Sequence, residues 1–442
     1  MTISSVVVRR GRLIVMAMAV VTAAAILWLS HTYTFYFDEW TFILSAPDWT
    51  WSTYLQPHNE HPVMLPRLIY AALLSTVGLR SYLPFMAALL ALHATSAVLL
   101  FEIVRRRAGA LVAIACAAMF LVLGAAWENL LWAFQIAFVG SVTCGLGMLL
   151  ALEGPPTPRR LPAASLLLAA SLAFSGMGIV FAAGAAVMLV LTPARRRDLL
   201  WFAPVIVLFG VWYLAFGRSG TPPNPPPAAA NVVLVPLFVA WGLGQSVAGL
   251  IGQGGSWGPP ALVVASWAVA MAWLRRRPDP FALGVLAALL AVYVVTGLGR
   301  VQLGVQQAGA GRYVYEGAAF WLILLGDAAR NLPWRGTWRP ALAACLFLAC
   351  FSSSVLLFTF AAAKGAQMQR EVADLQALAA ERSDPCLNPG GTADALVMPQ
   401  VNDPATYYRA VDRYGDPIAG LPVTDRADFD RARHNLLRAG CS

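Results

Sequence analysis

Charged residues are scarce in this chain, and lysine is almost missing from it. Of its 442 residues, 12% are charged and 59% are hydrophobic, whereas a soluble domain carries about 25% charged residues. Lys364 is the one lysine among 31 basic residues. The formal charge of +9 does not indicate nucleic acid, because the arginines stand in short clusters between apolar runs. We expect an integral membrane protein. Its expected partner is the lipid bilayer, and we expect no nucleic-acid partner.

Common motifs of soluble enzymes are also missing. The chain contains no glycine-rich phosphate loop with lysine, no Gly-x-Ser-x-Gly and no His-Glu-x-x-His. Nucleotide hydrolysis and serine or zinc hydrolase chemistry therefore have no support. The six cysteines show no spacing of a zinc site. We expect no cofactor and no divalent metal.

Apolar runs close to the length of a bilayer crossing recur along the chain, and they predict its fold class. We expect an all-α polytopic membrane protein with about 11 transmembrane helices. The expected spans are about 13–32, 82–104, 109–126, 130–152, 161–175, 179–193, 199–216, 259–274, 281–298, 314–330 and 340–361. Val63 to Leu79 is interpreted as an interfacial helix, and Asn231 to Gln253 as a re-entrant or interfacial segment. If either crossed the bilayer, a following arginine triplet would lie outside.

The arginines set the expected orientation. Seventeen lie at the predicted inner ends of the spans, five in the outer loops and none elsewhere before residue 363. By the positive-inside rule, the N-terminus is cytoplasmic in a bacterial inner membrane. Residues 1–362 then form the transmembrane domain, with an outer loop at 33–81, and residues 363–442 form a small extracytoplasmic C-terminal domain. In that oxidising location Cys386 and Cys441 form a disulfide, or else remain two unpaired thiols.

The outer loop opens with an acidic pair, Asp38-Glu39, just beyond the first apolar helix. Ionisable groups crowded beside a bilayer indicate a functional site. The low dielectric raises the pKa of such a carboxylate and makes it a useful general base. The alternative is that both are ordinary loop acids in water.

A second cluster in the same loop is flanked by Pro57 and Pro62 and consists of His58, Asn59, Glu60 and His61. The histidines are three apart, so they would share a face on a helical turn, but the prolines favour a loop or a helix start. Contacts to a sugar or phosphate, structural hydrogen bonds and, least favoured, a metal site remain open. We expect Arg67 to pair with Glu60 or Asp48.

Two further groups of candidate binding residues lie near predicted outer ends of spans. The first contains Trp127, Glu128, Asn129 and Gln135, and the second contains Arg300, Arg312 and Tyr313. Tryptophan with polar neighbours suits a sugar ring, and the arginine fork suits phosphate oxygens. The alternatives are that the tryptophans anchor the membrane interface and that the arginines extend to it.

The order of these features resembles the GT-C superfamily of glycosyltransferases, to which protein O-mannosyltransferases and the lipid A aminoarabinose transferase belong. The resemblance rests on a cytoplasmic N-terminus, one helix, an outer loop opening with Phe37-Asp38-Glu39, and about ten further spans. It implies an inverting transferase that takes a sugar from a polyprenyl-phosphate donor. Asp38 would be the base, with Glu39 assisting, and the acceptor would be a glycan, lipid or protein of the cell envelope.

Two other functions remain as alternatives. The first is a transporter or flippase of lipid-linked sugars, and the second is a non-enzymatic scaffold. The carboxylates Glu102, Glu316 and Asp327 lie near the ends of predicted spans and not at their middles, whereas coupled transporters place ionisable groups near the midplane. A deep outer cavity lined by Asp38, Glu60 and Arg312 would favour the enzyme, and a polar path across the bilayer would favour the transporter.

Overall fold

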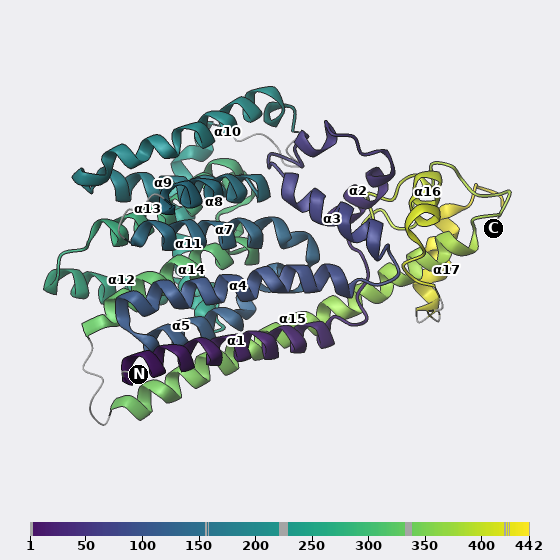
Figure 1. The fold of residues 1–442 in the computed structure, drawn as a ribbon. Helices are drawn as coiled ribbons and strands as arrows, with labels where there is room; N and C mark the ends of the chain where they lie inside the picture. Colours follow the sequence, from purple (N-terminus) through teal and green to yellow (C-terminus); the bar gives the residue numbers. More distant parts are fainter. Residues whose placement is uncertain are drawn as a thin grey trace.

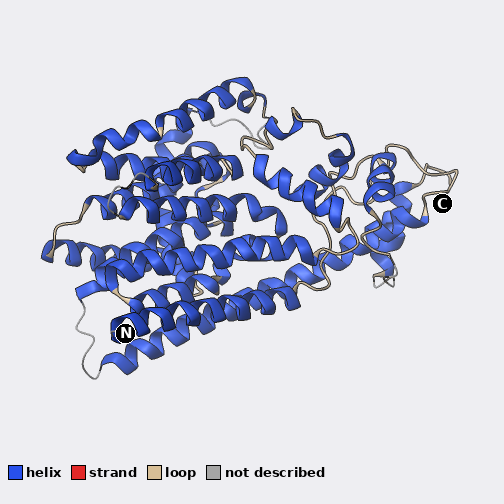
Figure 2. Cartoon of the chain, viewed as in Figure 1, coloured by secondary structure: helices blue, strands red, loops and turns tan. Residues whose placement is uncertain are grey.

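The computed structural model describes residues 3–154, 157, 159–220, 229–331, 338–419, 421, 423 and 425–441. These residues form helices and loops without a β-strand, which confirms the predicted all-α class (Figure 2). The α-helices are α1 (Ile3–Leu29), α2 (Asp38–Ser45), α3 (Met64–Thr76), α4 (Leu83–Ala108), α5 (Ala110–Leu121), α6 (Trp127–Leu131), α7 (Ile136–Glu153), α8 (Arg160–Phe174), α9 (Gly178–Val190), α10 (Ala203–Ala215), α11 (Val235–Leu250), α12 (Gly258–Arg275), α13 (Pro280–Arg300), α14 (Gly311–Ala328), α15 (Trp338–Ala380), α16 (Pro404–Tyr414) and α17 (Arg426–Leu436).

The long helices lie side by side and give the bundle two distinct ends (Figure 1). We call one the arginine end, because Arg105–Arg107 and Arg275–Arg277 lie there. The guanidinium of Arg107 joins the ends of three helices, since it lies 2.9 Å from both Asp279 and Asp327. The other is the loop end, which carries α2 and α3. The gathering of these two arginine triplets at one end agrees with the predicted alternation of the helices.

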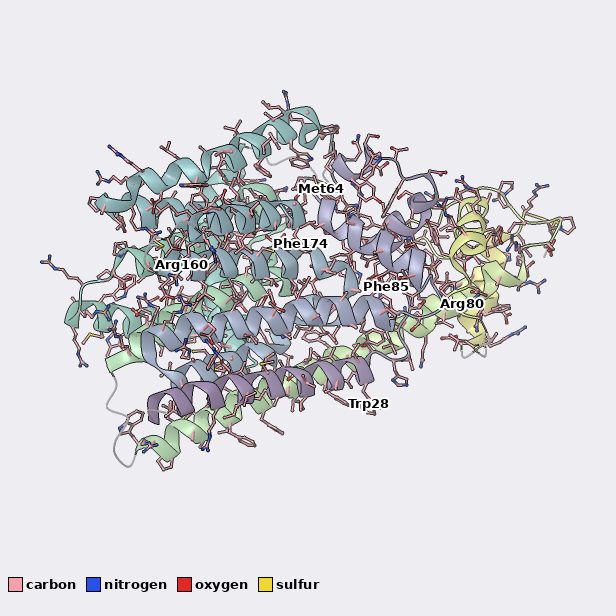
Figure 3. All side chains as sticks on the ribbon, in the orientation of Figure 1. Trp28, Met64, Arg80, Phe85, Arg160 and Phe174 are labelled. Carbon is pink, nitrogen blue, oxygen red and sulfur yellow. A yellow bond between two sulfur atoms is a disulfide. The ribbon has the colours of Figure 1, made fainter. Side chains whose placement is uncertain are left out.

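Seven helices of the described part are long and apolar enough to cross a bilayer, or nine if two bent pairs are each one span. Helices α8 and α9 are apolar but shorter, and α14 is absent from this set, so the count of eleven stays a prediction. Large apolar side chains face outward from the bundle, among them Trp28 with 68% of its surface exposed (Figure 3). Such a surface suits contact with lipid tails.

Helix α11 passes the same test of length and composition, but its contacts place it differently. Phe238 near its start packs against Gly297, at the loop end of α13, and Gly249 near its finish packs against Val314 in the first turn of α14. Both ends of α11 therefore lie in the half of the bundle nearest the loop end. This arrangement agrees with the interpretation of Asn231 to Gln253 as a segment that does not cross.

Helix α15 is continuous across residue 362, where the sequence suggested a domain boundary. Beyond the bundle it packs against α17, and the C-terminal segment lies over the loop end (Figure 1). The backbone N–H of Leu79 donates to the Tyr414 carbonyl at 2.9 Å, which ties α16 to the outer loop. Cys386 and Cys441 form a disulfide with their Cα atoms 5.9 Å apart.

Candidate active site

A strained turn presents Asp38 at the loop end. Phe37 has a φ of 48°, a left-handed conformation that a bulky residue rarely adopts, and α2 begins at the next residue. The turn leaves the Asp38 side chain 24% exposed. Strained backbone of this kind often accompanies functional positions, because the surrounding structure must hold it in place.

The predicted histidine cluster is a tight hairpin turn. The backbone N–H and carbonyl groups of His58 and His61 bond each other at 3.0 and 3.1 Å, and Asn59 takes a φ of 53°. Of the alternatives left open for this cluster, the loop that the flanking prolines favoured is present, and the helical turn is not. The turn places His58 Nε2 3.8 Å from Asp38 Oδ1. Burial lowers the pKa of His61 to about 4, so its imidazole is neutral at pH 7.

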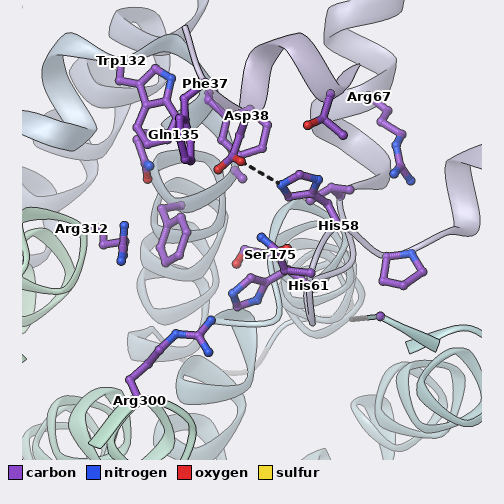
Figure 4. Close-up of a pocket in the computed structure, with 18 of the residues that line it drawn as sticks. Phe37, Asp38, His58, His61, Arg67, Trp132, Gln135, Ser175, Arg300 and Arg312 are labelled. Carbon is purple, nitrogen blue, oxygen red and sulfur yellow. Dashed lines mark ion pairs between the residues drawn. The ribbon is translucent and has the colours of Figure 1, made fainter. Parts of the chain in front are cut away.

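Asp38 and this hairpin open onto a cavity of about 760 Å³ (Figure 4). The predicted binding residues that line it are His58, Asn59, His61, Arg67, Gln135, Arg300, Arg312 and Tyr313. Aromatic rings of Phe37, Trp132 and Phe134 supply apolar walls. The cavity thus combines one exposed carboxylate with amides, imidazoles, guanidinium groups and aromatic faces.

Two arginines approach the cavity from helices α13 and α14 (Figure 4). Arg300 forms an ion pair with Glu60, whose side chain is 36% exposed. Arg312 lies 3.7 Å from Glu128 and stacks over the Tyr313 ring at 5.2 Å. Each arginine therefore has one carboxylate partner, and each can still offer N–H donors to an anion in the cavity.

Glu39 lies behind the cavity wall, not in it. Its carboxylate is fully buried and accepts hydrogen bonds from the hydroxyls of Tyr70 at 2.7 Å and Tyr82 at 3.1 Å, and from the Tyr36 N–H at 2.9 Å. Burial raises the pKa of Glu39 to about 7, although these hydrogen bonds oppose the rise. The two acids therefore occupy different environments, and Asp38 is the one that faces the cavity.

Arg67 does not form either of the ion pairs expected for it. Its guanidinium donates to the backbone carbonyls of Thr53, at 2.6 Å, and of Gln56. Of the expected partners, Glu60 pairs with Arg300, and Asp48 lies 3.4 Å from Arg409 of the C-terminal segment.

Three predicted binding residues on α6 do not line the cavity. Trp127 stacks on Phe360 of α15, with ring centroids 5.0 Å apart. Glu128 lies one step behind the wall and accepts the Arg312 backbone N–H at 3.0 Å. Asn129 is fully buried, and its amide has no hydrogen-bond partner among the described residues. Helix α6 therefore contributes to the cavity indirectly, because Glu128 binds Arg312 and Arg312 lines the cavity.

Several cavity residues were not identified from the sequence. They are Trp132, Ser175, Ser219, Gln307 and Gln400. Trp132 and Gln307 lie inside stretches that the sequence marked, whereas Ser175 and Ser219 lie in turns without a signal. Gln400 comes from the C-terminal segment, so that segment is part of the cavity wall. Within the described ranges, no group of three or more His, Cys, Asp or Glu side chains is arranged to hold a metal ion.

The chain was compared with protein families, curated proteins and solved structures. No protein-family model matches the sequence, and no curated protein matches it. Among solved structures, the chain is similar to the crystal structure of ArnT from Cupriavidus metallidurans bound to undecaprenyl phosphate. The two share 15% sequence identity over 95% of this chain and 77% of that chain, with a TM-score of 0.48.

Proposed function

We propose that this protein is an inverting membrane glycosyltransferase that moves a sugar from a polyprenyl-phosphate donor to an acceptor of the cell envelope. The observation that carries the proposal is the position of Asp38. It is the exposed carboxylate of a cavity whose other wall holds Arg300 and Arg312. A base opposite two guanidinium groups suits a reaction in which a hydroxyl attacks and a phosphate leaves.

In the proposed reaction, Asp38 takes the proton of an acceptor hydroxyl as the hydroxyl oxygen attacks the anomeric carbon. A new glycosidic bond forms, and the bond between that carbon and the donor phosphate oxygen breaks. The phosphate leaves with the electron pair, and Arg312 and Arg300 stabilise its negative charge. Attack from the face opposite the leaving group inverts the anomeric centre.

The polar lining supports a sugar as the group that moves. Sugars present hydroxyl edges, which amides bind, and apolar faces, which aromatic rings contact. Gln135 and Gln400 line the cavity, and their buried side-chain oxygens have no partner among the described residues. A buried carbonyl oxygen without a hydrogen bond is costly, so a ligand with hydroxyl groups would satisfy both.

We prefer transfer to transport because the cavity is confined to the loop end. Its lining comes from the outer loop, from helix ends there and from the C-terminal segment. We also propose that the loop end is extracytoplasmic in a bacterial inner membrane, since the arginine clusters lie at the opposite end. The polyprenyl tail would then lie in the bilayer with its phosphate entering the cavity.

The test is sugar transfer in membranes supplied with a panel of radiolabelled polyprenyl-phosphate sugars. Wild type is compared with Asp38→Asn and with a control in the same loop, Asp48→Asn, whose 67% exposed side chain lies outside the cavity. We expect transfer from one donor in wild type and control, and a loss in Asp38→Asn. Equal transfer in all three proteins would remove Asp38 from the reaction. No transfer from any donor by folded protein would instead favour transport.

A further inference from the structure

The single lysine of the chain is buried beneath the turn that presents Asp38. Lys364 is 5% exposed, although lysine is among the residues least often buried. The other 30 of the 31 Lys and Arg residues are arginines. A lone buried lysine is therefore a specific feature of this site, and the proposed transfer reaction does not use it directly.

Lys364 and its neighbour on α15 hold Tyr36 from two directions. The ammonium nitrogen of Lys364 lies 3.0 Å from the centroid of the Tyr36 ring, a close cation–π contact. Gln367 Nε2 donates to the Tyr36 hydroxyl oxygen at 3.0 Å. Tyr36 in turn donates its backbone N–H to Glu39 and directly precedes the strained residue Phe37.

These contacts belong to a longer row along one face of α15. Upstream of Lys364, the Ala361 carbonyl accepts the Tyr33 hydroxyl at 2.7 Å. Downstream, Glu371 accepts the Trp40 indole N–H at 3.1 Å. Positions three to four apart share a helix face, so α15 binds the outer loop at successive turns, on both sides of Asp38.

The charged side chains nearest to Lys364 are carboxylates. Burial lowers the pKa of Lys364 to about 7, and three carboxylates oppose this fall and favour the charged amine, namely Glu39 of α2, Glu371 of α15 and Glu128 of α6. Tyr36 is the titratable side chain in direct contact. Trp132, whose ring centroid is 5.9 Å from the ammonium nitrogen, separates it from the cavity. The lysine thus lies one side chain behind the wall that would hold the substrate.

We propose that Lys364 is a positioning residue, whose ammonium group fixes Tyr36 and Glu39 and thereby holds the Phe37–Asp38 turn in its strained form. A compact ammonium fits against the ring in this enclosed place, whereas the wide planar guanidinium of arginine needs more room. The role for Asp38 rests on the proposed function, but the link between Lys364 and Glu39 can be measured without any transfer activity.

The first experiment uses the fact that lysine occurs once. Protein labelled with [ε-13C]lysine gives a single lysine signal by NMR, whose position is followed against pH in nanodiscs. Glu39→Gln removes one anion that favours the charged amine, and we expect it to lower the titration midpoint by about one pH unit. Asp48→Asn, an exposed acid outside the cavity, should leave the midpoint unchanged. An identical midpoint in wild type and Glu39→Gln would overturn the proposed link.

The second experiment separates positioning from folding. We expect Lys364→Met and Lys364→Arg to lower kcat about 100-fold with KM nearly unchanged, the cost of a misplaced reacting group. Wild-type kcat in folded Lys364→Met would overturn the positioning role. If both variants fail to fold, the NMR midpoint still tests the link. If the midpoint shifts but no form of the protein transfers sugar, the proposed function fails and the link to Glu39 stands.

Discussion

The two ends of the helix bundle differ in how completely their charged and polar side chains are paired. At the arginine end, guanidinium groups and carboxylates form a network of ion pairs, in which one buried oxygen of Glu153 accepts no hydrogen bond from the described residues. Arg107 contacts Asp279, Asp327 and Glu153, and Glu102 binds both Arg12 and Arg105. These ion pairs join helices that are far apart in the sequence, so they serve to hold the bundle together.

At the loop end, Arg300 pairs with Glu60 and Arg312 with Glu128, but other polar groups around the cavity have no partner in the described part of the chain. Among the described residues, the side-chain oxygens of Gln135 and Gln400 and the Nε2 atom of His58 are buried without a hydrogen-bond partner. Asp38 is not closer than 3.8 Å to a basic nitrogen in the described ion pairs. Unmet polar groups around a cavity indicate a ligand, whereas closed pairs indicate structure. This difference supports our proposal that the loop end is the functional end.

The largest expected effect is on stability at the arginine end. Arg107→Met should lower the free energy of unfolding by about 3–5 kcal/mol, because it leaves a partly buried group of carboxylates without its cation. Arg276→Met is the control, since its 39% exposed side chain makes one weak pair at 3.8 Å. Thermal unfolding in detergent compares them. Similar midpoints for both variants would contradict a structural role for the Arg107 network.

The next largest effect is the dependence of the free energy of unfolding on pH, which we attribute to Glu39. Its pKa rises from 4.5 in the unfolded chain to about 7 in the folded protein, so the folded state binds the proton more tightly. The resulting stability is present below pH 4.5 and lost as pH rises through 7, about 3 kcal/mol in all. Glu39→Gln should lack this loss. Unfolding midpoints between pH 5 and 8 should therefore favour the variant increasingly as pH rises, and parallel curves would contradict the shift.

A somewhat smaller effect is expected on transfer when a cavity arginine is replaced. Arg312→Gln should lower the rate of sugar transfer about 100-fold, because it removes a donor to the leaving phosphate. Arg80→Gln changes an exposed arginine outside the cavity and should have no effect. The comparison is made in the donor assay at equal amounts of folded protein. A wild-type rate in Arg312→Gln would exclude this arginine from the reaction.

The smallest effect tests whether the C-terminal segment takes part in binding. Gln400→Ala should raise KM about tenfold and leave kcat close to wild type, since one hydrogen bond to a sugar is lost. Gln376→Ala is the control, because that amide binds the Leu421 carbonyl within the segment. If KM is unchanged in Gln400→Ala, the segment covers the cavity without binding the substrate.

Much of the architecture could be predicted because membranes impose simple rules on sequence. The charge clusters at Arg105–Arg107 and Arg275–Arg277 are sufficient by themselves to locate one end of the bundle. The number of spans stays a prediction, since α8 and α9 are apolar but shorter than the helices that meet a length rule. The interpretation of Asn231 to Gln253 as a re-entrant or interfacial segment came from the side on which the following arginines must lie, and it is compatible with the packing of α11 against α13 and α14.

The site could be predicted only in part, for reasons of local geometry. Asp38 and Glu39 are neighbours in sequence, but successive helical residues point about 100° apart, so just one faces the cavity. Arg67 was expected to find a carboxylate, yet its guanidinium binds the carbonyls of Thr53 and Gln56. Gln400 could not be placed, because its contact with the cavity depends on how the C-terminal segment folds back.

The most direct test makes the same substitution, Asp to Asn, at the loop end and at the arginine end of the bundle. Asp38→Asn and Asp327→Asn each replace a carboxylate by an amide, the first facing the cavity and the second within the Arg107 network. The measurement is sugar transfer per folded molecule. We predict a fall of about 1000-fold for Asp38→Asn, as expected for loss of a general base, and a rate near wild type for folded Asp327→Asn. Equal losses, or an undiminished rate in Asp38→Asn, would contradict the assignment of chemistry to the loop end.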